Sequence, residues 1–123
     1  MIIGVGVDII EVGRIRQAIE RVPSGPRFER RVFTVGEIVY CRKRRNAYES
    51  FAARFAAKEA VMKALGHAYG WREIEVIRSD GAPSIQLHGQ AREAADRLAV
   101  NRFHLALSHT AESAIAYVIA ERC

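Results

Sequence analysis

The segment from Phe51 to Gly66 most constrains what this chain can fold into, because it has the composition of one long helix. Charged residues also lie next to the apolar face of this predicted helix. Ala, Leu, Met, Lys and Glu are strong helix formers, and Ser50 and Gly66 are predicted to cap the start and the end. At about 100° per residue, one face forms an apolar stripe with a lysine inside it, made of Phe51, Phe55, Lys58, Met62 and Leu65. Alanines line the back of the helix and would let another element approach closely, at positions 53, 57, 60 and 64.

Three charged residues of this segment have an ordinary interpretation as well as a functional one. Glu59 and Lys63 stand four residues apart on the flank of the stripe, and such a surface pair stabilises a helix by about 0.2–0.5 kcal/mol. Lys58 lies within the stripe, where its methylenes can cover apolar surface while the ammonium reaches water. The other motifs of the chain decide between these interpretations.

Size, charge and cysteine content restrict the class of protein. The 123 residues suffice for one domain with its own core, and we assign residues 1–123 to it. The apolar opening is too short for a membrane span and is broken by Asp8, so we expect a cytoplasmic protein without membrane contact. Cys41 and Cys123 lack metal-ligand spacing, which predicts free, reduced thiols. The net charge of +5, with arginines crowded between residues 27 and 45, favours a polyanionic partner.

The hydrophobic pattern predicts an α+β fold in which a small, mostly antiparallel sheet packs with helices. Helices are expected over residues 11–22, 34–43, 51–65 and 90–100, strands over 2–8, 74–78, 84–88, 103–108 and 114–120, and a turn over 79–83. In the first helix, Arg14 and Arg21 project together away from a buried stripe formed by Val12, Ile15, Ile19 and Val22. Thr34 and Glu37 match a capping box at the start of the second helix.

Two carboxylates and one imidazole are candidates for chemistry. Asp8 is the only charged side chain in the first ten residues, so it either caps the helix that follows or binds a metal ion. Glu59 could supply a second carboxylate, and two carboxylates with waters and substrate phosphates form a typical Mg²⁺ site. Lys63, one turn further, could then reach a phosphate or a reacting hydroxyl. His109 follows a predicted strand, at a sheet end, where a phosphate contact is the milder functional interpretation.

Taken together, these segments resemble the holo-acyl-carrier-protein synthase family, the small bacterial phosphopantetheinyl transferases. The resemblance spans nearly the whole chain, and its most specific part is the central run Arg54-Phe55-Ala56-Ala57-Lys58-Glu59-Ala60 with Lys63-Ala64-Leu65-Gly66. The flanking matches are Gly4-Val5-Gly6-Val7-Asp8-Ile9, Gly81-Ala82-Pro83 with Leu87-His88-Gly89-Gln90-Ala91, and Leu107-Ser108-His109-Thr110. The loop 67–70 is shorter than the Gly/Thr-rich loop that family members usually carry there.

The resemblance implies an enzyme that moves the 4′-phosphopantetheine arm of coenzyme A onto a serine of an apo acyl carrier protein and releases adenosine 3′,5′-bisphosphate. Family members need Mg²⁺ and are typically homotrimers with active sites between protomers. This implies a place in lipid metabolism, such as fatty acid biosynthesis, without fixing which carrier protein is served.

The resemblance also assigns roles to residues. Asp8 and Glu59 match the metal ligands, and Lys63 matches a lysine near the diphosphate. These three are the expected catalytic residues, with Glu59 as a hypothetical base acting through a metal-held water. His109 lies in the segment that lines the coenzyme A site, and the coenzyme is also expected to meet basic side chains, among them Arg54 and Lys58. Arg14, and with it Arg21, matches a position that docks the acidic carrier protein.

Two other functions remain open from the residues. The arginine-rich region from 27 to 45 is also compatible with a nucleic-acid-binding domain, although it lacks interleaved aromatic residues and leaves Asp8 and Glu59 without a role. A non-catalytic relative that binds coenzyme A or a carrier protein would not need Asp8, Glu59 and Lys63 together. We therefore expect the transferase, with no nucleic-acid partner.

Overall fold

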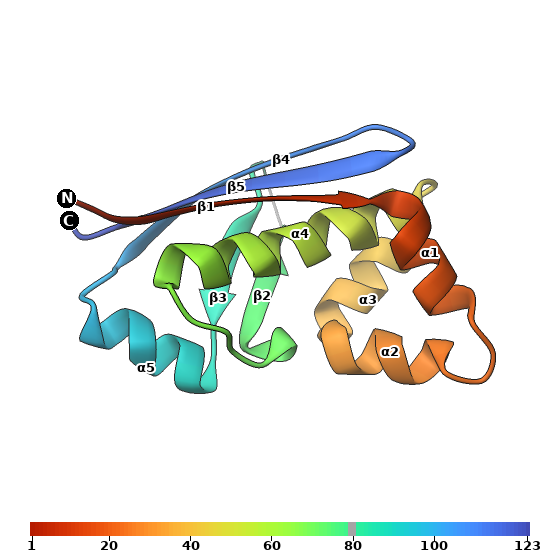
Figure 1. Cartoon of the computed structure of the whole chain (residues 1–123), viewed down its shortest axis with the longest axis horizontal. Coiled ribbons are helices and arrows are strands. Elements are labelled where there is room, and N and C mark those ends of the chain that lie inside the picture. The colour runs from red at the N-terminus through yellow and green to blue at the C-terminus, as the bar shows by residue number, and fades with distance from the viewer. Residues whose placement is uncertain (79–80) are drawn as a thin grey trace.

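The fold places one long helix under a three-stranded antiparallel sheet, with smaller elements at both ends of that helix (Figure 1). The structure is a computed structural model and describes residues 1–78 and 81–123. In chain order the elements are β1 (Ile2–Glu11), α1 (Val12–Glu20), α2 (Gly25–Val32), α3 (Val35–Arg42), α4 (Ala47–Leu65), the 3₁₀ turn η1 (Trp71–Glu73), β2 (Ile74–Ile77), β3 (Ser84–Leu87), α5 (Gly89–Arg97), β4 (Arg102–His109) and β5 (Ser113–Glu121).

The strand pairing confirms the predicted α+β class. The larger sheet has the order β1-β5-β4, and β2 pairs with β3 in a separate two-stranded sheet; all these pairs are antiparallel. Helices α1, α2 and α3 gather at one end of α4, while β2, β3 and α5 lie toward the other (Figure 1). The chain termini meet at one end of the sheet, where the Met1 amino group donates to the carbonyl of Arg122 at 2.8 Å.

The predicted elements are found, but several boundaries differ. Helix α4 begins at Ala47, so Ser50 is a buried residue of its first turns and not its cap, whereas Gly66 ends the helix in a left-handed conformation as predicted. Val22 is 88% exposed and lies beyond the end of α1, so its assignment to the buried stripe is wrong. The capping box of Thr34 and Glu37 is confirmed. Of the predicted turn 79–83, residues 79 and 80 lie outside the described residues.

Helix α2 was not predicted. Its sequence begins Gly25-Pro26 directly after Pro23 and Ser24, and such a cluster typically marks a loop. Proline is nevertheless well tolerated in the first turn of a helix, where its missing N–H would have no intrahelical partner. Gly25 also lets α2 approach α1 closely, because an added Cβ would lie 1.9 Å from the carbonyl oxygen of Ile19.

The contact between β1 and α4 is closer than side chains would normally allow. A Cβ on Gly4 would lie 1.9 Å from the carbonyl oxygen of Ala64, and one on Gly6 would lie 1.8 Å from that of Ala60. Two residues of a strand advance about 6.6 Å and four residues of a helix about 6 Å, so the two backbones stay in step over this distance. The predicted close approach along the alanine side of α4 is thereby confirmed.

The core also contains a fully buried ion pair. Lys58 and Glu37 each have 0% side-chain exposure, and the Lys58 ammonium donates to Glu37 Oε1 at 2.7 Å, to the carbonyl of Ile74 at 2.5 Å and to that of Trp71 at 3.0 Å. Burial lowers the pKa of Lys58, and the Glu37 carboxylate opposes this shift. The expectation that Lys58 reaches water is therefore wrong, because all three of its protons have partners inside the protein.

Both cysteines are free thiols, as expected. Cys41 is buried beside the α3–α4 contact, and burial raises the pKa of its thiol to about 12, so this thiol stays protonated and unreactive. Among the described residues, no helix combines the length and the hydropathy that crossing a bilayer would require.

Replacing Gly6 should disrupt the β1–α4 contact, whereas replacing Gly13 should not. We expect Gly6→Ala to lower the free energy of unfolding by about 2–3 kcal/mol or more, because the new methyl group meets backbone and not a flexible side chain. Gly13 lies in α1 with no atom within 4 Å of an added Cβ, so Gly13→Ala should raise stability by about 0.5–1 kcal/mol. Urea denaturation of both variants tests this, and equal effects would contradict the packing argument.

Candidate functional site

Asp8 lies on the inner face of β1, the same face as Gly4 and Gly6. Alternation along the strand buries Gly6 and Ile10 and turns Val5, Val7 and Ile9 outward. At Asp8, two residues after Gly6, the inner face of β1 again presents a side chain to α4. The Asp8 carboxylate therefore lies directly after the glycine-lined part of the contact. Glu11 is the N-cap of α1, so the alternative that Asp8 caps this helix is wrong.

Glu59 comes to Asp8 from the other side of this contact. Both carboxylates line one cavity of about 310 Å³. Burial raises the pKa of Glu59, the neighbouring Asp8 carboxylate raises it further, and Lys63 lowers it. The sequence prediction that these two distant acids meet is thus confirmed, and their mutual repulsion is the kind of arrangement that a bound cation would relieve.

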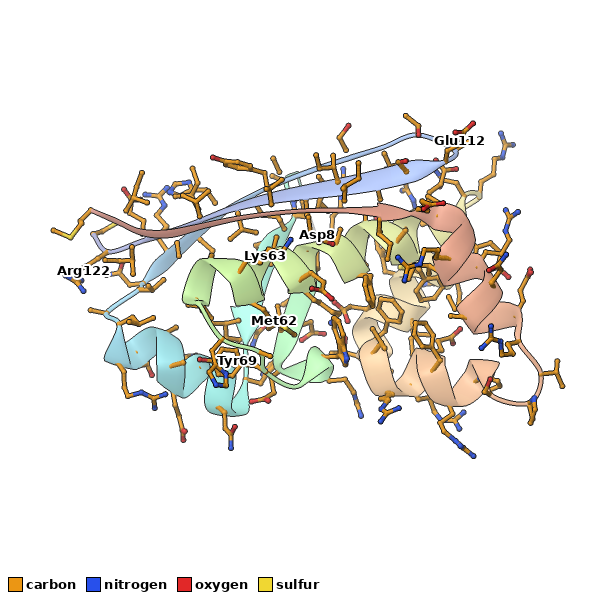
Figure 2. The ribbon with its side chains drawn as sticks, viewed as in Figure 1. Asp8, Met62, Lys63, Tyr69, Glu112 and Arg122 are labelled. Carbon is orange, nitrogen blue, oxygen red and sulfur yellow. The ribbon has the colours of Figure 1, made fainter. Side chains whose placement is uncertain are left out.

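Lys63 completes the charged group. Its ammonium donates to Asp8 Oδ1 at 3.1 Å and to the carbonyl of Val7 at 3.0 Å, and Figure 2 shows Lys63 and Asp8 between β1 and α4. The Asp8 side chain is 16% exposed and that of Lys63 is 53% exposed. The ion pair is therefore at the rim of the site, with its lysine mostly in solvent.

The cavity has an apolar wall opposite the carboxylates. It lies between β1, α1, α2 and α4, and it is lined by Ile10, Ile15, Ala18, Phe28 and Phe55, with Arg14 at its border. Phe55 stacks on Trp71 with ring centroids 4.7 Å apart and an interplanar angle of 25°. No local pattern predicted the contact of Trp71 with Phe55, because this contact depends on how the short loop after α4 folds back.

The side chains at this site fit a hard divalent cation. Mg²⁺ is commonly held by one or two carboxylates, with waters and substrate phosphates as the remaining ligands, and Asp8 and Glu59 supply two such carboxylates. No group of three or more His, Cys, Asp or Glu side chains suited to a metal ion occurs within residues 1–78 and 81–123. The donor set thus favours a cation that shares its ligands with a substrate.

His109 is not brought to the carboxylates within one chain. It ends β4, two strands away from β1 in the sheet, which corresponds to about 10 Å. Its Nδ1 lies 2.9 Å from Glu49 Oε1 near the start of α4. Within one chain, His109 therefore does not contact the two carboxylates.

The two other predicted coenzyme A contacts lie inside the protein. The ammonium of Lys58 is fully buried and fully hydrogen-bonded, so the prediction for Lys58 is wrong. Arg54 is 4% exposed, packs its guanidinium over the ring of Tyr40 at 4.2 Å and donates to the carbonyl of Ser50 at 3.4 Å. The same burial removes Arg54 from the surface that coenzyme A could reach on a single chain.

Arg14 and Arg21 are both exposed at α1, seven residues apart. Arg14 borders the cavity that contains Asp8 and Glu59, whereas Arg21 is the C-cap residue of the helix. Because two helical turns are about seven residues, the two guanidinium groups can lie on one side of α1 beside the entrance to the cavity.

Comparison with known proteins places this site in a family. A family model described as the 4′-phosphopantetheinyl transferase superfamily matches residues 4–118. The chain belongs to this superfamily. It is 48% identical over 126 residues to the holo-[acyl-carrier-protein] synthase of Koribacter versatilis, a match that covers 98% of this chain and 99% of the relative.

Solved structures of such transferases have the same fold. The holo-[acyl-carrier-protein] synthase of Neisseria meningitidis matches with a TM-score of 0.87 at 29% identity, over 99% of this chain and 100% of that one. The Helicobacter pylori synthase in complex with coenzyme A matches with a TM-score of 0.81 at 30% identity, over 95% and 99% of the two chains. Membership of the transferase superfamily favours the transferase over the nucleic-acid-binding alternative.

We expect the carboxylate of Glu59 to have a measurable effect on the stability of the protein. The pKa of Glu59 is higher in the folded protein than in the unfolded chain, so folding favours the protonated carboxyl and stability falls as pH rises through this interval. At pH 7.5 we expect Glu59→Gln to raise the melting temperature by about 1–3 °C, because partial solvent screening keeps the effect small. This gain in melting temperature should disappear at pH values below the pKa of Glu59 in the unfolded chain, because the carboxyl group is then protonated in both the folded and the unfolded protein.

Thermal melts across pH test this expectation. Glu93→Gln on the exposed face of α5 is a matched control, because it removes one carboxylate away from the cavity. A Glu59→Gln protein that melts no higher than the control at pH 7.5 would contradict the proposed repulsion between Glu59 and Asp8.

Proposed function

We propose that this protein transfers 4′-phosphopantetheine from coenzyme A to a serine of an apo acyl carrier protein, releasing adenosine 3′,5′-bisphosphate. The observation that carries this proposal is the meeting of Asp8, Glu59 and Lys63 at the border of one cavity, in a chain of the phosphopantetheinyl transferase superfamily. The similar synthase of Helicobacter pylori was solved with coenzyme A, which supports the same coenzyme as the substrate here. All three charged groups are present, so we favour an enzyme over a non-catalytic relative.

The proposed reaction is a displacement at phosphorus. The serine oxygen attacks the β-phosphorus of the diphosphate, a new P–O bond forms, the bond to the bridging oxygen breaks, and the serine proton leaves. Such transfers depend on positioning and on neutralising negative charge more than on covalent catalysis. Asp8 and Glu59 would hold Mg²⁺, which supplies charge neutralisation on the diphosphate when bound.

Protein residues would do the rest. The Lys63 ammonium is near enough to the carboxylates to reach a phosphate oxygen bound beside them. Glu59 is our proposed base, because it is the second carboxylate in the lining of the cavity where the diphosphate would bind. In this scheme Asp8, Glu59 and Lys63 are the catalytic residues, and Phe55 belongs to the apolar lining of the cavity beside them.

The transfer itself is tested by the mass of the carrier protein. We expect the wild-type protein with coenzyme A and Mg²⁺ to add one phosphopantetheine group to an apo carrier, as measured by intact-protein mass spectrometry. Asp8→Ala should lower the rate at least about a hundredfold, because the metal site loses one of its two carboxylates. Asp96→Ala on exposed α5 is the control and should keep wild-type activity. No modification of several carrier proteins by the wild type would refute the proposed activity.

The proposed carrier contact uses Arg14 and Arg21. Both are exposed, Arg14 in the lining of the cavity and Arg21 at the end of α1, and guanidinium groups suit an acidic partner. We expect Arg14→Glu to raise the KM for the carrier protein about tenfold or more while changing the KM for coenzyme A little. Steady-state kinetics with each substrate varied separately would measure this, with Arg97→Glu on α5 as a charge-matched control. Equal effects on both KM values would contradict the docking role.

We also propose a homotrimer with active sites between protomers, acting in the cytoplasm. Support comes from the outer face of the large sheet, where apolar side chains stay exposed on neighbouring strands: Val5 48%, Val7 47%, Ile9 66%, Ile115 39% and Tyr117 45%. Monomeric proteins rarely leave such a continuous apolar face uncovered. An interfacial site would also explain why His109 lies away from the carboxylates of its own chain, since His109 could serve the site of a neighbour.

A further inference from the structure

One carboxylate at the proposed metal site already has a positively charged partner. Asp8 Oδ1 accepts a hydrogen bond from the Lys63 ammonium at 3.1 Å, and the same ammonium donates to the carbonyl of Val7 at 3.0 Å. Glu59 lies one turn before Lys63 on α4; burial and the Asp8 carboxylate raise the pKa of Glu59, and Lys63 opposes this shift. Two carboxylates and one ammonium thus share a single site.

The Lys63 ammonium and a divalent cation would both be bound by the negative charge of the Asp8 carboxylate. A cation that binds there has to displace Lys63 from Oδ1, to bind beside it against charge repulsion, or both. Either way, the Lys63–Asp8 ion pair lowers the affinity of the site for the cation. The pair is easy to break, because the Lys63 side chain is 53% exposed and its charge stays hydrated when it leaves.

We propose that Lys63 is a displaceable counter-ion of Asp8, which neutralises this carboxylate until a divalent cation takes its place. An ammonium released from Asp8 would be available to a diphosphate bound at the same site. This inference rests on the proposed function and adds an order of events to it. Lys63 opposes cation binding in the absence of coenzyme A and favours coenzyme A binding once the cation is bound.

The charge count supports this exchange. Asp8, Glu59 and Lys63 together carry a charge of −1, a divalent cation changes this to +1, and a diphosphate with two negative charges returns it to −1. No intermediate leaves two carboxylates facing each other without a positive charge between them. Because binding free energies are reciprocal, the diphosphate should strengthen cation binding through Lys63 by the same factor by which the cation strengthens diphosphate binding.

Removing the charge of Lys63 should therefore shift two affinities in opposite directions. We expect Lys63→Met to bind Mn²⁺ about three- to tenfold more tightly than the wild type without coenzyme A, a modest factor because the Lys63 side chain is 53% exposed. With saturating Mn²⁺, the same variant should bind coenzyme A more weakly than the wild type. Electron paramagnetic resonance of free Mn²⁺ measures the first affinity, and isothermal titration calorimetry measures the second.

The controls separate this exchange from other effects of the substitution. Lys43→Met removes one positive charge from an exposed position at the end of α3 and should leave Mn²⁺ affinity unchanged. Lys63→Arg keeps the charge and should keep the weak Mn²⁺ binding of the wild type. Lys63→Gln repeats the neutral substitution with a polar side chain, should Lys63→Met fail to fold.

The outcomes distinguish this inference from the proposed function. Unchanged or weaker Mn²⁺ binding in both Lys63→Met and Lys63→Gln would overturn the counter-ion role even if the wild type modifies its carrier. Mn²⁺ binding that does not depend on Asp8 would overturn it as well. Failure of the wild type to modify any carrier would instead refute the transfer reaction, while tighter Mn²⁺ binding by Lys63→Met would still support the exchange at Asp8.

Discussion

The arrangement of this protein depends on the side-chain-free contact between β1 and α4. Gly4 and Gly6 bring the strand against the carbonyl oxygens of Ala64 and Ala60, and the similar advance of two strand residues and one helical turn keeps the two backbones in step. Asp8 is the first charged residue along that inner face, and it therefore reaches the flank of α4 that carries Glu59 and Lys63. Bulkier residues at positions 4 and 6 would separate the two elements and with them the two carboxylates.

A second constraint acts on a different side of α4. Lys58 and Glu59 are neighbours in the sequence, but about 100° of rotation sends one into the core and the other toward the cavity. Lys58 ties Glu37 in α3 to the carbonyls of Trp71 and Ile74, and Glu37 also accepts from the backbone N–H of Val76 at 2.8 Å. A buried ion pair contributes little net stability compared with apolar side chains of the same size. Its role here is to fix the short loop after α4, and so to hold Trp71 against Phe55.

Local sequence signals predicted the local features and missed the long-range ones. The C-terminal end of α4, the capping box of α3 and the antiparallel strands follow from periodicity and capping residues. The partner of Lys58 could not be predicted, because Glu37 lies 21 residues away and serves its own helix cap at the same time. Helix α2 was missed because Pro and Gly suggest a loop, although both fit its first turn. The pairing of Asp8 with Glu59 was predicted only by combining segments, since each acid alone has an ordinary explanation.

The position of His109 separates it from the proposed metal site of its own chain. The carboxylates, Lys63, the apolar cavity and Arg14 lie together at the β1 edge of the sheet, whereas His109 lies on β4 at the other edge and contacts Glu49. Between these edges, the outer face of the sheet exposes valine, isoleucine and tyrosine side chains on β1 and β5. If copies of the chain associate through this face, the β4 edge of one copy can approach the β1 edge of another. Assembly and catalysis would then depend on the same surface, and a loss of trimer contacts would separate His109 from the metal site.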